Sequence, residues 1–199
     1  MAIDHRRVAV ATVVGGLLLG AVDLLLQKSL PYPWADLANS TAVWAVAAFG
    51  LGTWVRSPWW RAAAAGVVLL VLAVPAYYLT ATLVQNDDLA NAWSTTSLLW
   101  MFFGVLAGTL FGTAGAFASA AGWRGVLAVA LPGAVLFAEA LVIVRRDAFG
   151  WTAIIELALG VLIILAVART ARNRLTALVA ALPLALIGFA GFRLGGFLP

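Results

Sequence analysis

The stretch Gly16–Lys28, GLLLGAVDLLLQK, decides how the chain is organised. It begins as an apolar run of the kind that spans a membrane, and then carries an aspartate inside that run. Its small and polar residues recur at i, i+4, i+7 and i+11, which is one face of a helix: Gly16, Gly20, Asp23 and Gln27. A carboxyl group that faces lipid is costly, so this face is expected to turn towards other helices or a cavity. We therefore expect the rest of the chain to be built around Asp23.

The composition is that of an integral membrane protein. Of the 199 residues, 64% are hydrophobic and only 10% are charged, which is too few charges to cover a soluble domain. The chain has no cysteine and one histidine, His5, which precedes the first apolar segment. Thiolate and histidine metal sites and a membrane-embedded Ser-His-Asp triad are therefore unsupported, and we expect no metal and no cofactor. The net charge of +4 comes from arginines at helix ends and does not indicate nucleic-acid binding.

Seven apolar segments are each long enough to cross a hydrocarbon core of roughly 30 Å as a helix that rises ~1.5 Å per residue. They cover residues 8–27, 37–55, 62–83, 92–119, 125–144, 150–168 and 175–192. We predict an all-α polytopic bundle of seven transmembrane helices that forms one domain, residues 1–199. The fourth segment has a glycine at every fourth position, at Gly104, Gly108 and Gly112, and separates three segments from three. The glycine repeat provides a groove against which a neighbouring helix can pack closely. The position of this segment suggests the 3+1+3 arrangement of some transporters.

The basic residues predict the topology. Eight arginines fall in the loops on the side of the N-terminus, whereas the opposite side has four basic residues and most of the loop acids. Cytoplasmic loops carry an excess of lysine and arginine. We therefore expect a multi-pass protein of the cell inner (plasma) membrane, with its N-terminus in the cytoplasm and its C-terminus outside.

Three acidic residues lie within apolar segments at a similar depth. Asp23, Glu139 and Glu156 are each about four to six residues from the predicted outer end, roughly 6–9 Å below the interface at ~1.5 Å per residue. A single buried acid can simply pair with a neighbour, but intramembrane acids are functional candidates. We predict these three as the catalytic residues. Polar and aromatic side chains near that depth are predicted to line a substrate chamber: Gln27, Trp44, Tyr77, Tyr78, Ser97, Trp100, Phe103 and Phe137.

A carboxylic acid in an apolar, aromatic-walled chamber can protonate an alkene or an epoxide. Aromatic faces then stabilise the carbocation, exclusion of water protects it, and a second carboxylate can remove the final proton. The chain length, the seven segments and the scattered acids resemble the small integral membrane terpene cyclases of bacteria, which act on prenylated indoles or farnesylated diketopiperazines. The stretches Ala38–Gly52, ANSTAVWAVAAFGLG, and Pro75–Tyr78, PAYY, also look like those of uncharacterised actinobacterial membrane proteins.

This resemblance implies an acid-initiated, metal-independent terpene cyclase. By resemblance, the essential acids would be Asp23 and one of Glu139 or Glu156. The expected partners are a lipophilic isoprenoid substrate and membrane lipid, with no nucleic acid.

Two other functions stay open. A small-molecule transporter or a substrate-binding membrane subunit would also use outward-facing acids, and the 3+1+3 layout would suit proton-coupled uptake. A transporter should expose a second polar path towards the cytoplasm, and the inner halves of the segments carry no cluster of acids or hydroxyls, which favours the enzyme. An accessory membrane protein without catalysis is the third function.

Overall fold

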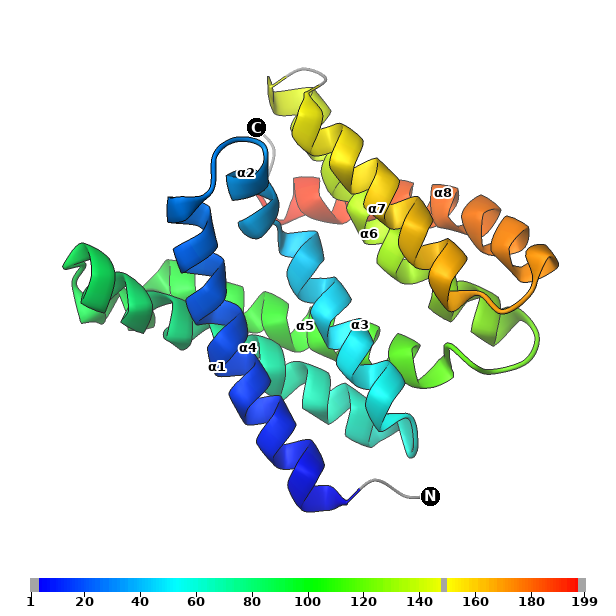
Figure 1. The fold of residues 1–199 in the computed structure, drawn as a ribbon, viewed down its shortest axis with the longest axis horizontal. Coiled ribbons are helices and arrows are strands. Elements are labelled where there is room, and N and C mark those ends of the chain that lie inside the picture. The colour runs from blue at the N-terminus through cyan, green and yellow to red at the C-terminus, as the bar shows by residue number, and fades with distance from the viewer. Residues whose placement is uncertain (1–3, 148–149, 197–199) are drawn as a thin grey trace. The chain divides into compact units, whose positions relative to one another are not determined.

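The computed structural model describes residues 4–147 and 150–196, which form helices and loops with no strand among them (Figure 1). In chain order the elements are α1 (His5–Ser29), α2 (Trp34–Ala38), α3 (Thr41–Val55), α4 (Trp59–Gln85), the 3-10 helix η1 (Leu89–Trp93), α5 (Thr95–Phe117), α6 (Trp123–Asp147), α7 (Trp151–Val167) and α8 (Ala171–Leu194). The all-α prediction is therefore confirmed.

Each of the seven predicted segments falls on one of the longer helices. Five of them, α1, α4, α5, α6 and α8, are long and apolar enough to cross a membrane. The other two, α3 with 15 residues and α7 with 17, are apolar but shorter. At ~1.5 Å per residue, these two helices extend roughly 23–26 Å, less than a typical hydrocarbon core. The protein is thus a multi-pass helical membrane protein by length and composition, and the count of seven spans stays a prediction.

The helices group into two compact units. The first contains α1, α2, α3 from Trp44 onwards, α4, η1 and α5 as far as Ala116. The second contains residues 40–43, which include the first turn of α3, together with α6, α7 and α8. The helix with the glycine repeat, α5, therefore groups with the helices before it. The single domain and the 3+1+3 arrangement stay predictions.

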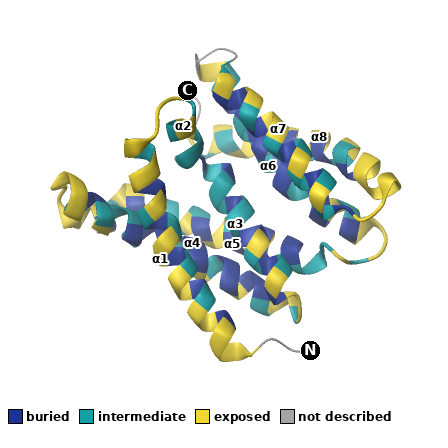
Figure 2. Cartoon of the chain, in the orientation of Figure 1, coloured by how far each residue is buried: buried dark blue, intermediate teal, exposed yellow. Residues whose placement is uncertain are grey.

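In the first unit, α1 packs directly on the backbone of α4 through the predicted glycine stripe. A Cβ atom on Gly16 would lie 2.6 Å from the carbonyl oxygen of Leu69, and one on Gly20 would collide with the carbonyl oxygen of Ala73. Figure 2 shows buried bands along α1 between wider exposed ones. The stripe turns inward as predicted, and Asp23, further along it, is only 6% exposed.

The glycine repeat of α5 is a second close-packing surface of the same unit. A Cβ atom on Gly108 would lie 2.5 Å from the carbonyl carbon of Gly66 on α4. The predicted packing role of this repeat is therefore confirmed, because α4 and α5 approach at backbone distance, where small residues are required.

In the second unit, α6 packs against both α7 and α8. Its core consists mostly of alanine with a few larger side chains, among them Phe137 and Ile164. Phe137 lies over Gly160 of α7, where a Cβ atom would be 2.6 Å from its ring. The structure therefore shows Phe137, predicted as a chamber residue, packed in the core of this unit.

Replacing Gly20 with leucine is expected to force α1 and α4 apart, because the added side chain has no space against the backbone of α4. We expect the free energy of unfolding of the detergent-solubilised protein to fall by at least about 2 kcal/mol, which is in the upper part of the range for overpacked sites. Thermal unfolding measures this change. Gly50→Ala is the matched control, since no atom lies within 4 Å of a Cβ there. Equal melting temperatures for both variants would contradict the packing described above.

Candidate functional site

Asp23 interacts with side chains from two other helices of the first unit. The indole of Trp44 on α3 donates a hydrogen bond to its carboxyl group. Tyr77 on α4 lies within electrostatic range of the same carboxyl. The Oδ1 atom of Asp23 is buried and has no hydrogen-bond partner among the described residues. The hydrogen-bonding capacity of this buried carboxyl group is therefore only partly used by its neighbours.

Gln27 connects this acid to a wider polar cluster. Its Nε2 atom donates to the hydroxyl of Tyr77 at 3.2 Å and to Oδ1 of Asn39 at 3.5 Å. The ring of Tyr78 meets that of Tyr77 edge to face, with centroids 5.4 Å apart. The structure thus brings together five of the predicted site residues, Asp23, Gln27, Trp44, Tyr77 and Tyr78, and Asn39 is an addition. Its position at the start of the second apolar segment was the only signal in the sequence.

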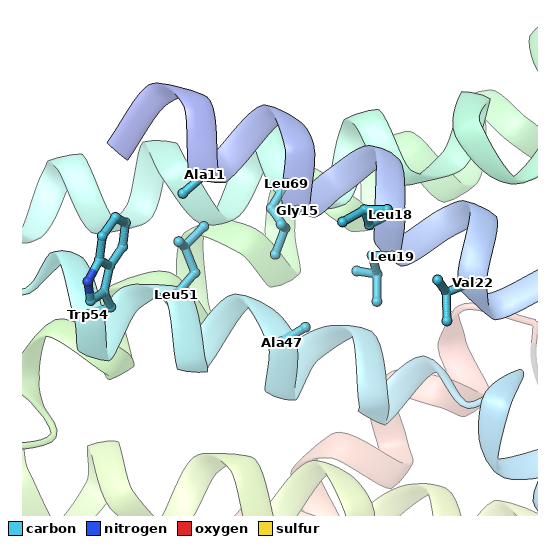
Figure 3. A pocket seen from close by; sticks show the side chains of 9 residues that line it. All are labelled: Ala11, Gly15, Leu18, Leu19, Val22, Ala47, Leu51, Trp54 and Leu69. Carbon is cyan, nitrogen blue, oxygen red and sulfur yellow. The ribbon is translucent and has the colours of Figure 1, made fainter. Parts of the chain in front are cut away.

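An apolar groove of about 500 Å³ lies in the same unit, bordered by α1, α3 and α4. Figure 3 shows α1 facing an antiparallel α3 across it, with Ala11 and Trp54 at one end and Val22 at the other. The lining residues are Ala11, Gly15, Leu18, Leu19, Val22, Ala47, Leu51, Trp54 and Leu69. The volume is within the range of small-molecule sites, and the lining offers no polar side chain other than the indole nitrogen of Trp54.

Helical periodicity puts the Asp23–Trp44 pair at the Val22 end of this groove. Asp23 follows the lining residues Leu19 and Val22 by four positions and one position, and it lies beside the lining stripe of α1, on the neighbouring glycine stripe that packs on α4. Trp44 precedes the lining residue Ala47 by three positions and continues the lining stripe of α3. The groove is therefore apolar along its length, and a buried acid lies beside its Val22 end without being one of its lining residues.

Three further predicted site residues lie on α5. Ser97 is fully buried, its hydroxyl donates to the carbonyl oxygen of Asn91, and its backbone N–H donates to the hydroxyl of Ser94 at 3.2 Å. These bonds fix the turn from η1 into α5. Trp100 and Phe103 pack edge to face, with ring centroids 6.3 Å apart. None of these three residues is among those that line the groove.

In the second unit, the carboxylate of Glu139 caps the amino end of α3. It accepts hydrogen bonds from the backbone N–H groups of Thr41 and Ala42, at 3.0 and 2.7 Å. It also accepts from the hydroxyls of Ser40 and Thr41, at 2.6 and 2.9 Å. The first N–H groups of a helix have no partner within it, and negative charge is favourable there. Glu139 therefore has a structural role that its position in the sequence did not reveal.

Glu156 on α7 is the second acid of this unit, and it has no such partners. Its side chain is fully buried, and neither carboxyl oxygen has a hydrogen-bond partner among the described residues. Glu139 and Ser40 lie nearby, but the Ser40 hydroxyl is donated to Glu139. Thr152, Glu156 and Gly160 follow one another at intervals of four residues, and all three lie on the buried face of α7.

The three predicted catalytic acids thus divide between the units. Asp23 belongs to the first, and Glu139 and Glu156 to the second. A chamber shared by all three stays a prediction. Within residues 4–147 and 150–196, no group of three or more histidine, cysteine, aspartate or glutamate residues could hold a metal ion.

Replacing Glu139 with glutamine should destabilise the protein by about 2–3 kcal/mol, because the amide cannot accept all four hydrogen bonds and loses the charge that faces the helix end. Glu156→Gln is the matched control, since it removes no hydrogen bond found in the structure. Unfolding of both variants in detergent, followed by tryptophan fluorescence, measures the difference. Equal destabilisation would contradict the capping role of Glu139.

The sequence profile of one protein family matches residues 4–195. The chain belongs to DUF6518, a family of unknown function. No protein of curated function and no solved structure matches the chain. The family match spans both units, so the groove of the first unit and the acid pair of the second lie within the family's domain.

Proposed function

We propose that this DUF6518 protein is a membrane-embedded terpene cyclase in which Asp23 protonates an isoprenoid substrate. The observation that carries the proposal is a buried carboxyl group whose Oδ1 atom has no partner among the described residues, next in the chain to Val22 at one end of the apolar groove. An acid in such surroundings can deliver a proton to a carbon atom that offers no lone pair. The resemblance to small membrane terpene cyclases supports the same chemistry.

The groove suits a hydrocarbon substrate. Its aliphatic walls bury an isoprenoid chain by the hydrophobic effect and exclude the water that would capture a carbocation. Two aromatic faces are close to the path of the chain, Trp54 in the groove wall and Trp44 beside the acid. Tryptophan is the side chain that stabilises a cation most strongly through its ring.

The proposed reaction is an isomerisation that returns the acid to its starting state. The O–H bond of Asp23 breaks as the π electrons of the terminal alkene form a C–H bond, which leaves a tertiary carbocation. A second alkene attacks this cation and closes a ring, so that a new C–C bond forms and the positive charge moves along the chain. The Asp23 carboxylate then removes a proton from a carbon next to the cation, and a new alkene forms. An epoxide substrate would take the first proton on its oxygen instead.

The neighbouring polar residues position the acid. Gln27 and Tyr77 form a hydrogen-bonded pair beside Asp23. Trp44, which contacts the carboxyl directly, follows the turn of α3 that Glu139 caps. In this proposal Glu139 acts as a positioning residue rather than as the proton donor.

The proposed topology has all seven apolar helices crossing the inner membrane, with the N-terminus in the cytoplasm. The asymmetry of the arginines supports this orientation. The two shorter helices, α3 and α7, carry or adjoin the buried polar groups, and a locally thinned bilayer would accommodate them.

Asp23→Asn should abolish turnover of an isoprenoid with a terminal alkene or epoxide, because the amide cannot donate a proton to carbon. The expected loss is at least about a thousandfold, at the upper end of what acid–base groups contribute. The assay incubates protein in nanodiscs with alkene (not epoxide) isoprenoid substrates in deuterium oxide and identifies products by mass spectrometry, since only a proton delivered to carbon leaves a label that does not exchange. The wild-type product should carry one deuterium.

Asp87→Asn, in an exposed loop, is the matched control and should keep full activity. An Asp23→Asn variant that cyclises at the wild-type rate would overturn the proposal. A wild-type product without deuterium would overturn it as well.

The buried pair in the second unit favours one other function, proton-coupled transport of a small molecule. A charged carboxylate without partners is costly to bury, so Glu156 is suited to carry a proton beside the capped Glu139. Proteoliposomes with an imposed pH gradient test this function, with accumulation of labelled isoprenoids and small cations as the measurement. Transport would require gradient-driven uptake that Glu156→Gln eliminates. If the wild-type protein and Glu156→Gln both bind the labelled molecules to the same extent with and without the gradient, transport is excluded.

A further inference from the structure

All three helices that border the groove carry an arginine at its Trp54 end. On α1, Arg7 precedes the lining residue Ala11 by four positions and continues the lining stripe. On α4, Arg61 precedes the lining residue Leu69 by eight positions, a little over two helical turns towards the Trp54 end. At the end of α3, Arg56 has a left-handed backbone with φ of 59°, and its Nε atom donates a hydrogen bond to the carbonyl oxygen of Thr53 at 3.1 Å, which leaves its two Nη groups for a ligand.

The ends of these helices lie together. Val8 of α1, Val55 of α3 and Ala62 and Ala65 of α4 form one buried cluster. Each of the three arginines is the sequence neighbour of a member of this cluster: Arg7 precedes Val8, Arg56 follows Val55, and Arg61 precedes Ala62. The guanidinium groups therefore originate around one end of the groove.

No carboxylate on the lining helices offsets this positive charge. Neither α3 nor α4 contains an acidic residue, and Asp23 is the only one in α1. Between Arg7 and Asp23, α1 rises about 24 Å at ~1.5 Å per residue. Asp4, which precedes α1, caps that helix by accepting from the backbone N–H of Arg6. The groove thus runs from a basic end to an acidic end with hydrocarbon walls between them.

We propose that the occupant of the groove is a prenyl diphosphate, with its diphosphate at Arg7, Arg56 and Arg61 and its terminal alkene at Asp23. Arginine is the side chain best suited to bind phosphate oxygens, through charge-assisted hydrogen bonds. The groove volume of about 500 Å³ is closer to that of one prenyl chain than to that of the paired acyl chains of a phospholipid. This inference deepens the proposed function and rests on it for the chemistry at Asp23.

The orientation has a chemical consequence. Protonation occurs at the alkene end, so the C–O bond to the diphosphate stays intact throughout the reaction. The product is a cyclic prenyl diphosphate, and no inorganic diphosphate is released. The arginines act on binding and orientation, and the proton transfers stay with Asp23.

The test is a binding measurement on full-length protein in nanodiscs, by quenching of tryptophan fluorescence. Geranylgeranyl diphosphate should bind at least about tenfold more tightly than geranylgeraniol, which has the same chain without the charged head, since hydrogen bonds to charged groups are worth about 1.5–3 kcal/mol. Arg7→Gln and Arg61→Gln should each remove roughly tenfold of the diphosphate affinity. The affinity for the alcohol should stay unchanged in both variants.

Arg6→Gln is the matched control, because it removes the same charge next to Arg7 but lies on a stripe of α1 that continues to the exposed Val10. It should leave the diphosphate affinity unchanged. An equal loss in Arg6→Gln would show general attraction to a basic surface and overturn the proposal. So would equal affinities of the wild-type protein for the diphosphate and the alcohol, or displacement of the diphosphate by equimolar phosphatidylglycerol.

Binding in the Asp23→Asn background separates this inference from the proposed function. If that variant binds the diphosphate with the same dependence on the arginines, the assignment of the groove stands, whether or not the wild-type protein turns the ligand over. If the wild-type protein cyclises neutral isoprenoids but discriminates against the diphosphate, the cyclase function stands and the assignment of the head group is wrong.

Discussion

The close contact of α1 with α4 is the constraint on which the candidate site depends. Gly16 and Gly20 let the two backbones approach to a distance that any side chain would prevent. Asp23, on the same stripe, is thereby carried into the unit and away from lipid. A carboxyl group is tolerated there because the indole of Trp44 satisfies part of its hydrogen-bonding capacity. The same contact brings Gln27 against Tyr77, so one packing interface assembles the polar cluster.

The two acids of the second unit show that burial alone does not define a role. Glu139 accepts four hydrogen bonds from the first residues of α3, whereas Glu156, nearby, accepts none from the described residues. The first is the kind of carboxylate that holds a helix end, and its removal would leave several donors without partners. The second has no structural partner to explain it, which is why it supports a proton-carrying function. Two glutamates of similar depth in the sequence thus differ entirely in what surrounds them.

The groove combines an apolar lining with charged residues near its two ends. Its hydrocarbon lining follows from helices that must also face lipid, and such walls carry no specificity for one apolar chain over another. In the proposed assignment the ends supply the specificity, because Arg7 and its neighbours on α3 and α4 would favour an anion and Asp23 would favour a proton acceptor. An amphiphile that enters with its charged head towards the arginines presents its far end to the acid. The charged groups near the two ends of the groove would then orient the ligand and also place its reactive alkene beside the acid.

The sequence by itself determined the helical class, the seven apolar segments and the inward turn of Asp23. These follow from hydropathy and from helical periodicity, which depend only on residues near one another in the chain. It also determined that Gly108 packs against another helix, because a glycine repeat has few other uses in a membrane helix. The sequence predicted that Asp23, Trp44 and Tyr77 lie at a similar depth, but it did not predict that they interact with one another.

Only the tertiary structure decided which groups meet. It showed that Phe137 lies in a core, that Ser97 holds a turn and that Glu139 caps the start of α3. It also showed a groove whose lining residues cannot be distinguished from lipid-facing ones in the sequence. The physical reason is that rotation and separation of packed helices depend on side chains from several distant segments at once. A stripe on one helix specifies which face is buried, and the neighbours that cover that face specify what the buried group can do.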